Sequence, residues 1–244
     1  MGQKTIISWT QRTWNPWRGC TKISPGCKNC YMFTAQNRYG NDPAIVVRTK
    51  TWGDPLRWQR QAERDERHEL VFTCSWSDWF HEAADPWRDE AWQVVKQCRN
   101  LVFQILTKRP ERIAECLPDD WNEGYPNVWL GTSVENKRYV WRIDELRAVP
   151  ATVRFISAEP LLGSLAGLSL EDIDWLIVGG ESGPSFRPMD LAWARELRDL
   201  ALAWGVPFFF KQSAALRTET GTTLDGCEWH QMPESSVTFE QSLS

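Results

Sequence analysis

Short apolar runs, rich in β-branched and aromatic residues, recur along the chain after residue 70. Each run is almost continuously apolar, as in strands that are buried on both faces of a parallel sheet. Their starts are 22 to 32 residues apart, which leaves room for a helix between successive strands. The pattern predicts parallel strands alternating with helices. The expected strands are 70–74, 101–106, 127–132, 152–157, 174–179 and 206–210.

Helical spacing and capping residues occupy the segments between these runs. Asp190 can cap the start of a helix over 191–204, and Gly205 can end it. Asp85 and Pro86 can open another helix. The other expected elements are helices over 54–68, 86–100, 109–117 and 136–148, strands at 5–9 and 44–48, and a loop or hairpin over 213–233 that turns at Asp225–Gly226.

The number of repeating units bears on the architecture. Six or seven β/α units favour a (β/α) barrel or partial barrel, although their spacing alone does not distinguish it from an open sheet. We therefore expect an α/β fold with about six to seven parallel strands. Residues 1–233 are expected to form a single domain that includes a loop over about 14–31, followed by a flexible tail over 234–244.

The composition is that of an ordinary globular protein. With 42% hydrophobic and 25% charged residues, it excludes disordered, collagen-like and coiled-coil proteins. No apolar run reaches the roughly 18 residues of a membrane helix, and the amino terminus lacks the apolar segment of a signal peptide. We expect a cytoplasmic protein with no membrane partner.

The net charge of −4 conceals an uneven distribution. Residues 1–60 carry ten Lys or Arg and two Asp, a balance of +8, whereas the remainder carries 18 basic and 30 acidic residues, a balance of −12. The basic quarter can attract a phosphate-bearing partner such as nucleic acid, or it can be a solvated surface. The 16 Trp residues can fill a core or stack on bases.

Polar residues follow nearly every expected strand at the point where it ends. Because the loops at the carboxyl ends of the strands build the active site of a β/α barrel, these residues are expected to form one ligand-binding rim. Each has a plainer interpretation on its own: Lys108–Arg109 as a surface pair, Glu159 as a loop cap, and Lys211 as a structural ion pair. The pattern they form together favours a ligand site.

Cys20, Cys27 and Cys30 lie within eleven residues, in a C-x6-C-x2-C spacing. Seven cysteines, an odd number, argue against a disulfide framework. Thiolates select zinc or iron–sulfur clusters, and a structural zinc needs four ligands, whereas no fourth Cys or His is close in the sequence. The spacing favours a [4Fe–4S] cluster with one open iron over zinc or free structural thiols. The other cysteines expected to be buried in the core are Cys74, Cys98 and Cys116.

A three-cysteine loop at the start of a β/α barrel resembles the radical SAM superfamily. More closely, the chain is similar to a phage- and prophage-associated three-cysteine family that is itself distantly similar to spore photoproduct lyase. The stretches that carry this resemblance span 13–212 and are TWNPWRGCTKISPGCKNCY, SWSDWFH, LTKRPER, WLGTSVEN, ISAEPLLG, VGGESGPSFRPM and VPFFFKQ.

The resemblance implies a radical SAM-like barrel and a cluster held by Cys20, Cys27 and Cys30. In that superfamily the open iron chelates S-adenosylmethionine through its amino and carboxylate groups. One-electron reduction then cleaves it to methionine and a 5′-deoxyadenosyl radical. An external electron donor of the flavodoxin or ferredoxin type would be the partner.

Two features depart from the usual superfamily pattern. The usual spacing is C-x3-C-x2-C, and the usual Gly-Gly-Glu segment, which binds the methionine amino group, follows the second strand. Here Gly179-Gly180-Glu181 follows a late strand, and Ser75-Trp76-Ser77-Asp78 takes the earlier place. The expected cofactor contacts are Ser75, Ser77 and Asp78 near the methionine, Glu159 and Glu181 at the ribose or amino group, Lys211 at the carboxylate, and Thr132 and Gly180. The expected substrate contacts are Lys108, Arg109, Glu135, Asn136, Arg187 and Gln212.

Three hypotheses of function follow. The first is a radical SAM-like enzyme that begins radical modification or repair of a larger substrate, with nucleic acid as the first candidate. The second is an iron–sulfur protein that binds nucleic acid or senses redox state without SAM chemistry. The displaced Gly-Gly-Glu segment favours the second, whereas the polar rim on six strands favours the first. The third is a zinc-stabilised β/α protein.

Overall fold

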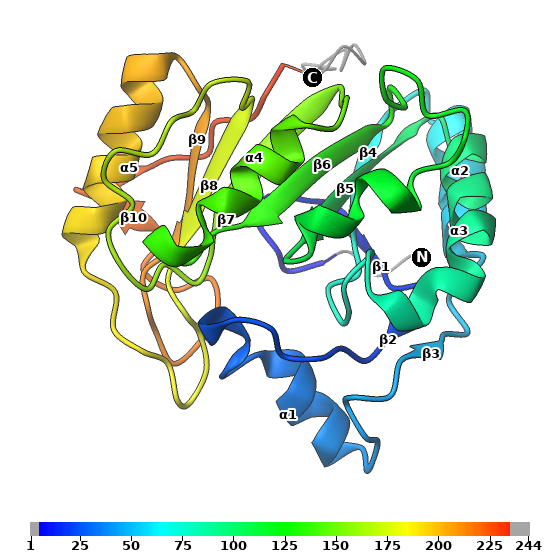
Figure 1. The fold of residues 1–244 in the computed structure, drawn as a ribbon, viewed down its shortest axis with the longest axis horizontal. Helices are drawn as coiled ribbons and strands as arrows, with labels where there is room; N and C mark the ends of the chain where they lie inside the picture. The colour runs from blue at the N-terminus through cyan, green and yellow to red at the C-terminus, as the bar shows by residue number, and fades with distance from the viewer. Residues whose placement is uncertain (1–4, 235–244) are drawn as a thin grey trace.

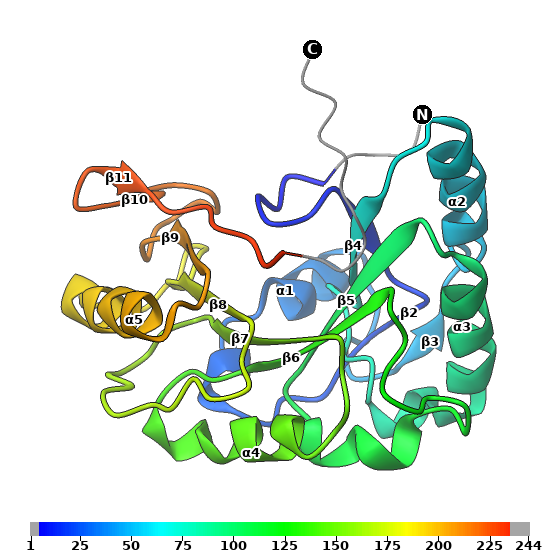
Figure 2. The ribbon, with the colours of Figure 1, turned by 90° about the horizontal axis from the view of Figure 1, so that it is seen from above.

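A seven-stranded parallel sheet forms the centre of the molecule, whose computed structural model describes residues 5–234. The strand order is β1-β4-β5-β6-β7-β8-β9, and every neighbouring pair is parallel. The sheet curls into a partial barrel that stays open along one side (Figure 2). The predicted α/β partial barrel with about six to seven parallel strands is confirmed. Of the expected tail over 234–244, all but Glu234 lies outside the described residues.

The long strands of the sheet correspond to the six apolar runs of the sequence. Each strand begins within two residues of the expected start. The runs identified the strands because a strand that is covered on both faces is apolar along its whole length. These strands are β4 (Glu69–Thr73), β5 (Leu101–Thr107), β6 (Val128–Ser133), β7 (Val153–Ala158), β8 (Trp175–Gly179) and β9 (Phe208–Gln212), and β1 (Arg12–Trp14) pairs with β4 at the sheet edge.

Helices α2 (Asp54–Arg64), α3 (Asp85–Gln97), α4 (Trp141–Arg147) and α5 (Leu191–Trp204) lie outside the curl, and α1 (Tyr31–Arg38) lies across one end of it (Figures 1 and 2). The predicted caps of α5 are confirmed. The Asp190 carboxylate accepts a hydrogen bond from the Ala192 amide at 2.8 Å, and Gly205 ends the helix with φ +68°. Within the described residues, no helix is both long and apolar enough to cross a membrane.

Two expected elements differ from the structure at the amino-terminal part of the chain. The segment 5–9 is not a strand, because Trp9 turns into the concave face and packs on Phe72 with ring centroids 4.6 Å apart. The expected strand over 44–48 shrinks to β3 (Val47–Arg48), which pairs antiparallel with β2 (Trp17–Arg18) outside the main sheet.

The connecting segments also differ in detail. Residues 109–117 form two 3₁₀ turns instead of a helix, since so short a segment gains little from helix formation. The hairpin is confirmed, with Asp225 and Gly226 both at positive φ as a tight two-residue turn requires. The remaining short elements are η1 (Pro25–Cys27), η2 (Glu82–Ala84), η3 (Pro110–Arg112), η4 (Ala114–Cys116), η5 (Lys137–Tyr139), β10 (Thr223–Leu224) and β11 (Cys227–Glu228).

The two faces of the sheet bury different sets of residues. Alternate side chains of each strand point outward and pack with the helices in the main core. The opposite set fills the amino-terminal half of the concave face with an aromatic plug, which comprises Trp9, Phe72, Trp129, Phe155, Trp175 and Phe209. Gly131 is needed there because a Cβ at this position would lie 2.4 Å from the Phe155 ring.

Toward the carboxyl ends of the strands, the side chains on the concave face change from aromatic to polar. Ser133 on β6, Ser157 on β7 and Lys211 on β9 share the concave face with plug residues that lie two or four positions earlier. The plug therefore closes the bottom of the partial barrel, and its carboxyl end can hold a ligand.

Candidate functional site

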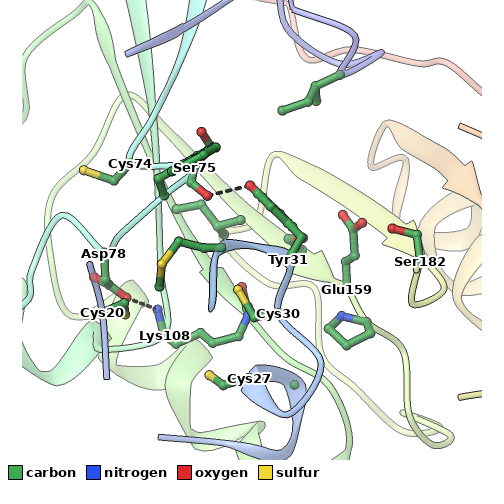
Figure 3. A pocket seen from close by; sticks show the side chains of 18 of the residues that line it. Cys20, Cys27, Cys30, Tyr31, Cys74, Ser75, Asp78, Lys108, Glu159 and Ser182 are labelled. Carbon is green, nitrogen blue, oxygen red and sulfur yellow. Dashed lines mark hydrogen bonds between the residues drawn. The ribbon is translucent and has the colours of Figure 1, made fainter. Parts of the chain in front are cut away.

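A cavity of about 640 Å³ lies at the carboxyl ends of β4 to β9, a size suited to a small-molecule cofactor. It is closed on one side by the cysteine loop, defined here as residues 19–30, and by Tyr31 at the start of α1 (Figure 3). The sequence-predicted site residues that line it are Cys20, Cys27, Cys30, Ser75, Ser77, Asp78, Lys108, Arg109, Glu159, Gly180, Glu181 and Lys211.

Cys20, Cys27 and Cys30 are free thiols on the wall of this cavity. Burial raises the pKa of Cys20 to about 12 and also raises the pKa of Cys30, and the nearby Cys27 adds to both shifts. A bound metal centre would have to displace these protons to obtain thiolate ligands. Cys74 also borders the cavity, but its thiol points away from the other three and its side chain belongs to the main core (Figure 3). Cys74, Cys98 and Cys116 are buried, as predicted.

The donor set can be tested against zinc and against an iron–sulfur cluster. Around one tetrahedral zinc, thiolate ligands approach one another to about 3.8 Å. Within residues 5–234, no three His, Cys, Asp or Glu side chains form a group that could hold one metal ion. A [4Fe–4S] cluster binds each thiolate through a different iron, so its ligands have to surround a cavity. Cys20, Cys27 and Cys30 are free and all border the same cavity, which fits that requirement.

The residues that follow β4 hold the two ends of the cysteine loop. The Ser77 hydroxyl donates to the Gly19 carbonyl at 2.6 Å, and the Tyr31 hydroxyl donates to the Ser75 carbonyl at 2.5 Å. Ser75 itself is bound through its hydroxyl to Asn15 at 3.0 Å. The Ser-x-Ser segment therefore supports the loop as well as bordering the cavity.

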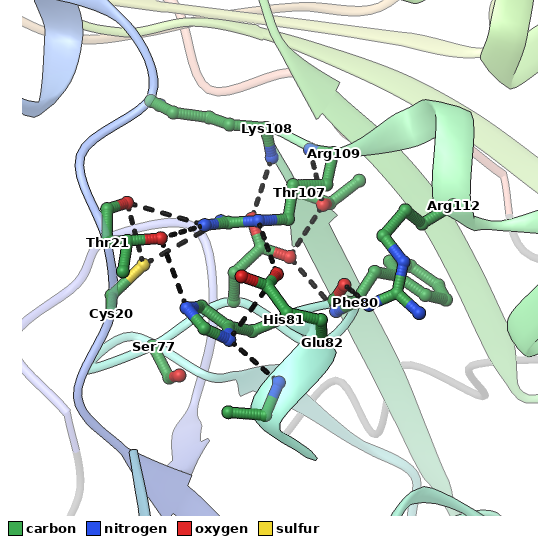
Figure 4. A network of polar contacts seen from close by, with 12 residues as sticks. Cys20, Thr21, Ser77, Phe80, His81, Glu82, Thr107, Lys108, Arg109 and Arg112 are labelled. Carbon is green, nitrogen blue, oxygen red and sulfur yellow. Dashed lines mark hydrogen bonds and ion pairs between the residues drawn. The ribbon is translucent and has the colours of Figure 1, made fainter. Parts of the chain in front are cut away.

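Arg109, just beyond β5, anchors the Cys20 arm of the loop, which consists of Cys20 and Thr21 (Figure 4). Its guanidinium donates to the Thr21 hydroxyl at 2.6 Å and to the Cys20 sulfur at 3.8 Å. Asp78 lies 3.5 Å from the same guanidinium and accepts a hydrogen bond from the Thr107 hydroxyl at 2.7 Å. Arg109, predicted as a substrate contact, thus binds residues of the protein itself.

Glu135, just beyond β6, anchors the middle of the loop and is fully buried. It accepts hydrogen bonds from the Ser24 hydroxyl at 2.5 Å and from the Arg142 guanidinium at 3.0 Å. The loop approaches so closely that a Cβ at Gly26 would lie 2.4 Å from Glu135 Oε1. Lys108 Nζ lies 3.7 Å from the same oxygen.

Glu181, just beyond β8, anchors the end of the loop. Asn29 donates to its carboxylate at 2.9 Å, and the Arg187 guanidinium donates to it at 2.5 Å. Arg187 also donates to the Pro25 carbonyl at 3.0 Å. Although burial acts to raise the pKa of Glu181, the hydrogen bonds from Arg187 and Asn29 lower it below its ordinary value.

Glu159 and Lys211 form a polar pair on the wall that the ends of β7 and β9 contribute, the facing wall of the cavity. Lys211 Nζ lies 2.6 Å from Glu159 Oε1, and both residues line the cavity. Ser133 and Ser157 line the cavity beside them, on the concave face of the sheet. This wall offers one cation and one anion to a ligand, a set of charges complementary to an amino-acid zwitterion.

Five sequence-predicted residues lie outside the cavity lining. Each has an internal partner: Thr132 donates to the Thr107 carbonyl, and Asn136 accepts from the Arg138 amide. Gln212 binds the Gly180 carbonyl and the Glu219 amide. Gly180 itself does line the cavity, and a Cβ there would lie 2.2 Å from the Ala214 nitrogen, so packing within the chain explains this glycine. The five predicted site residues that do not line the cavity are Thr132, Glu135, Asn136, Arg187 and Gln212.

The sequence interpretation missed several residues of the cysteine loop and its support. Thr21, Asn29 and Tyr31 stand directly beside the cysteines in the sequence and hold the loop to the strand ends. His81, Nε2 of which lies 3.2 Å from the Thr21 hydroxyl, belongs to the same network. Adjacency to a cysteine was the signal that could have identified the first three.

Comparisons with known proteins find one family and two solved structures to which the chain is similar. The family described as "Protein of unknown function (DUF5131)" matches residues 4–233. The chain is similar to spore photoproduct lyase complexed with dinucleoside spore photoproduct, with a TM-score of 0.47 and 13% identity over 75% of this chain and 58% of that one. It is also similar to a double mutant of that lyase with bound AdoMet and the same dinucleoside, with a TM-score of 0.45 and 13% identity over 76% and 59%. The chain thus spans less than two thirds of either structure, and no curated protein matches it.

Proposed function

The chain belongs to the DUF5131 family, and on that premise we propose that it is a radical SAM-like [4Fe–4S] enzyme. It cleaves S-adenosylmethionine reductively to begin radical modification or repair of a larger substrate, with nucleic acid as the candidate class. One observation carries the proposal: three free cysteines of one loop share a cavity with the polar carboxyl ends of six parallel strands. In this proposal residues 1–233 act as one domain, and the phage association stays a prediction.

Each wall of the cavity has its own part in this function. Cys20, Cys27 and Cys30 would hold the cluster, which when bound supplies the electron for cleavage. On the facing wall, the Lys211 ammonium is suited to bind the carboxylate of S-adenosylmethionine and the Glu159 carboxylate its amino group. The aromatic plug below excludes water from the bottom of the site.

The candidate substrate class rests on the surface around the cysteine loop. Lys22, Lys28 and Arg38 are exposed there, in the basic amino-terminal quarter. Tyr31 is also exposed and lines the cavity, where a base could stack on its ring. Nucleic-acid affinity should therefore fall steeply with ionic strength, whereas that of an uncharged substrate should not. The electron donor would be an external protein of the flavodoxin or ferredoxin type.

A second candidate is an iron–sulfur protein that binds nucleic acid or senses redox state without SAM chemistry. The observation that favours it is the use of Asp78, Arg109, Glu135 and Glu181 to hold the cysteine loop. A rim used in this way supports a stable cluster, whether or not a small cofactor binds beside it.

The test is anaerobic purification with iron and sulfide quantitation, followed by reduction with dithionite in the presence of S-adenosylmethionine. We expect about four irons per chain, an EPR signal that changes on adding S-adenosylmethionine, and 5′-deoxyadenosine by chromatography. Alanine at Cys20, Cys27 or Cys30 should abolish iron binding. Alanine at the exposed Cys227 is the matched control and should retain all of it.

The outcomes separate the candidates. An iron–sulfur cluster that does not respond to S-adenosylmethionine would contradict the enzyme and favour the second candidate. Zinc in place of iron would contradict both.

A further inference from the structure

Arg109 brings a buried positive charge into direct contact with the first cysteine of the loop. Only 4% of the residue is exposed. Its Nη1 lies 3.8 Å from the Cys20 sulfur, and its Nη2 donates to the Thr21 hydroxyl at 2.6 Å and to the Thr21 carbonyl at 3.4 Å (Figure 4). The two halves of one planar guanidinium therefore bind the sulfur and the residue that follows it.

Two carboxylates also hold this guanidinium in position. Asp78 lies 3.5 Å away and is itself held by the Thr107 hydroxyl at 2.7 Å, the Lys108 amide at 2.9 Å and the Phe80 amide at 3.0 Å. Glu82 lies 3.7 Å from Arg109 Nε. A buried charge that is paired and hydrogen-bonded in this way is held in one place.

The charges around Cys20 explain why a cation is needed there. The Asp78 carboxylate lies 3.5 Å from Arg109 Nη1, and the same nitrogen lies 3.8 Å from the Cys20 sulfur. An anionic sulfur at this position would therefore be repelled by Asp78 if Arg109 were absent. The other two cysteines have no guanidinium contact among the hydrogen bonds of residues 5–234; Cys27 is bound by the Ser24 hydroxyl at 3.6 Å.

We propose that Arg109 is a positioning residue for the cluster: it fixes the Cys20 arm through Thr21 and places a positive charge beside the first ligand. The inference rests on the cluster of the proposed function and assigns Arg109 a role other than substrate contact. Two consequences follow. The cluster is retained more tightly, as with other residues that orient metal ligands, and it is easier to reduce, because reduction adds negative charge next to a cation.

Four variants of the full chain separate these two effects. Arg109→Gln removes the charge. Arg109→Lys keeps the charge but loses the planar guanidinium, whose two nitrogens bind Cys20 and Thr21 together. Thr21→Val removes the hydroxyl and leaves the charge in place. Arg112→Gln is the matched control, because Arg112 lies on the next turn and binds Asp85 and the Phe80 carbonyl instead of the loop. The measurements are iron retention against a chelator and the midpoint potential from an EPR redox titration.

We expect Arg109→Gln to lower iron affinity by roughly 10–100-fold and to make the midpoint potential more negative. Arg109→Lys and Thr21→Val should weaken iron retention while keeping a potential close to that of the wild type. Arg112→Gln should change neither quantity.

A wild-type potential in Arg109→Gln would overturn the assignment of the charge. If that variant does not fold, wild-type iron retention in both Arg109→Lys and Thr21→Val would overturn the positioning role. A wild-type protein that holds four irons but never cleaves S-adenosylmethionine would contradict the proposed enzyme and leave the role of Arg109 intact. A wild-type protein that takes up no iron would remove both.

Discussion

The two walls of the cavity use charged residues from the same sheet edge in different ways. On the side of the cysteine loop, the anchors Arg109, Glu135 and Glu181 are each bound to the loop and to a second charged residue. On the facing wall, Glu159 and Lys211 bind each other and line the open cavity. A charged residue at the end of a barrel strand can therefore hold either the protein or a ligand.

The reason lies in the backbone of the cysteine loop. Apart from the single 3₁₀ turn over Pro25–Cys27, the loop has no regular structure to pair its carbonyl groups. Backbone carbonyl groups without such pairing need other donors, which come from Ser77 to Gly19, from Arg109 to Thr21 and from Arg187 to Pro25. Glu135 and Glu181 in turn accept hydrogen bonds from the Ser24 and Asn29 side chains of the loop. The facing wall has no such loop to support.

The largest expected effect comes from removing an anchor of the loop wall. Glu135→Ala leaves the buried Arg142 guanidinium without its carboxylate, so we expect a loss of about 3–5 kcal/mol in the free energy of unfolding. Urea denaturation of the metal-free protein measures it. Glu145→Ala, at an exposed position on α4, is the control and should stay within about 0.5 kcal/mol of the wild type. A loss below about 1 kcal/mol at Glu135 would remove the distinction between the two walls.

The fold was predictable because its signals are local. Continuous apolar runs identified the long strands, and the pair Asp190 and Gly205 identified both ends of α5. The strand predicted over 5–9 was wrong because Ile6, Ile7 and Trp9 are apolar whether they pair in a sheet or pack against its concave face. Ile6 is 74% exposed whereas Trp9 is 4% exposed, a difference that only the three-dimensional packing decides.

The candidate site was predictable in position but not in role. The strand ends placed the polar residues on one edge, which the cavity lining matches. The partner of each depends on contacts between distant residues: 89 positions separate Arg109 from Cys20, and 152 separate Glu181 from Asn29. No local pattern encodes such a pairing, so ligand contacts and loop anchors looked alike in the sequence.

A residue of the facing wall should behave in the opposite way to Glu135. Lys211→Met removes the cation proposed for the S-adenosylmethionine carboxylate and should weaken binding about tenfold, as expected when a charge-assisted hydrogen bond is lost. Isothermal titration calorimetry on the reconstituted protein measures this. Lys96→Met, at an exposed ion pair with Asp120, should leave the affinity unchanged. Unchanged affinity at Lys211 would mean that its ion pair with Glu159 is structural only.

The smallest expected effect is a pH dependence of the loop wall. Because the folded-state pKa of Glu181 lies below its ordinary value, the unfolded chain takes up the proton first as the pH falls. The stabilisation from Glu181 is therefore complete above the ordinary glutamate pKa of about 4.3 and is lost as the pH falls through the lower folded-state value. Solvent screens the half-buried Arg187 and keeps the effect modest. The free energy of unfolding of the metal-free wild type should exceed that of Glu181→Gln at pH 7, and the gap should narrow below pH 4. A gap that stays constant with pH would mean that the Glu181–Arg187 pair holds the loop by shape and not by charge.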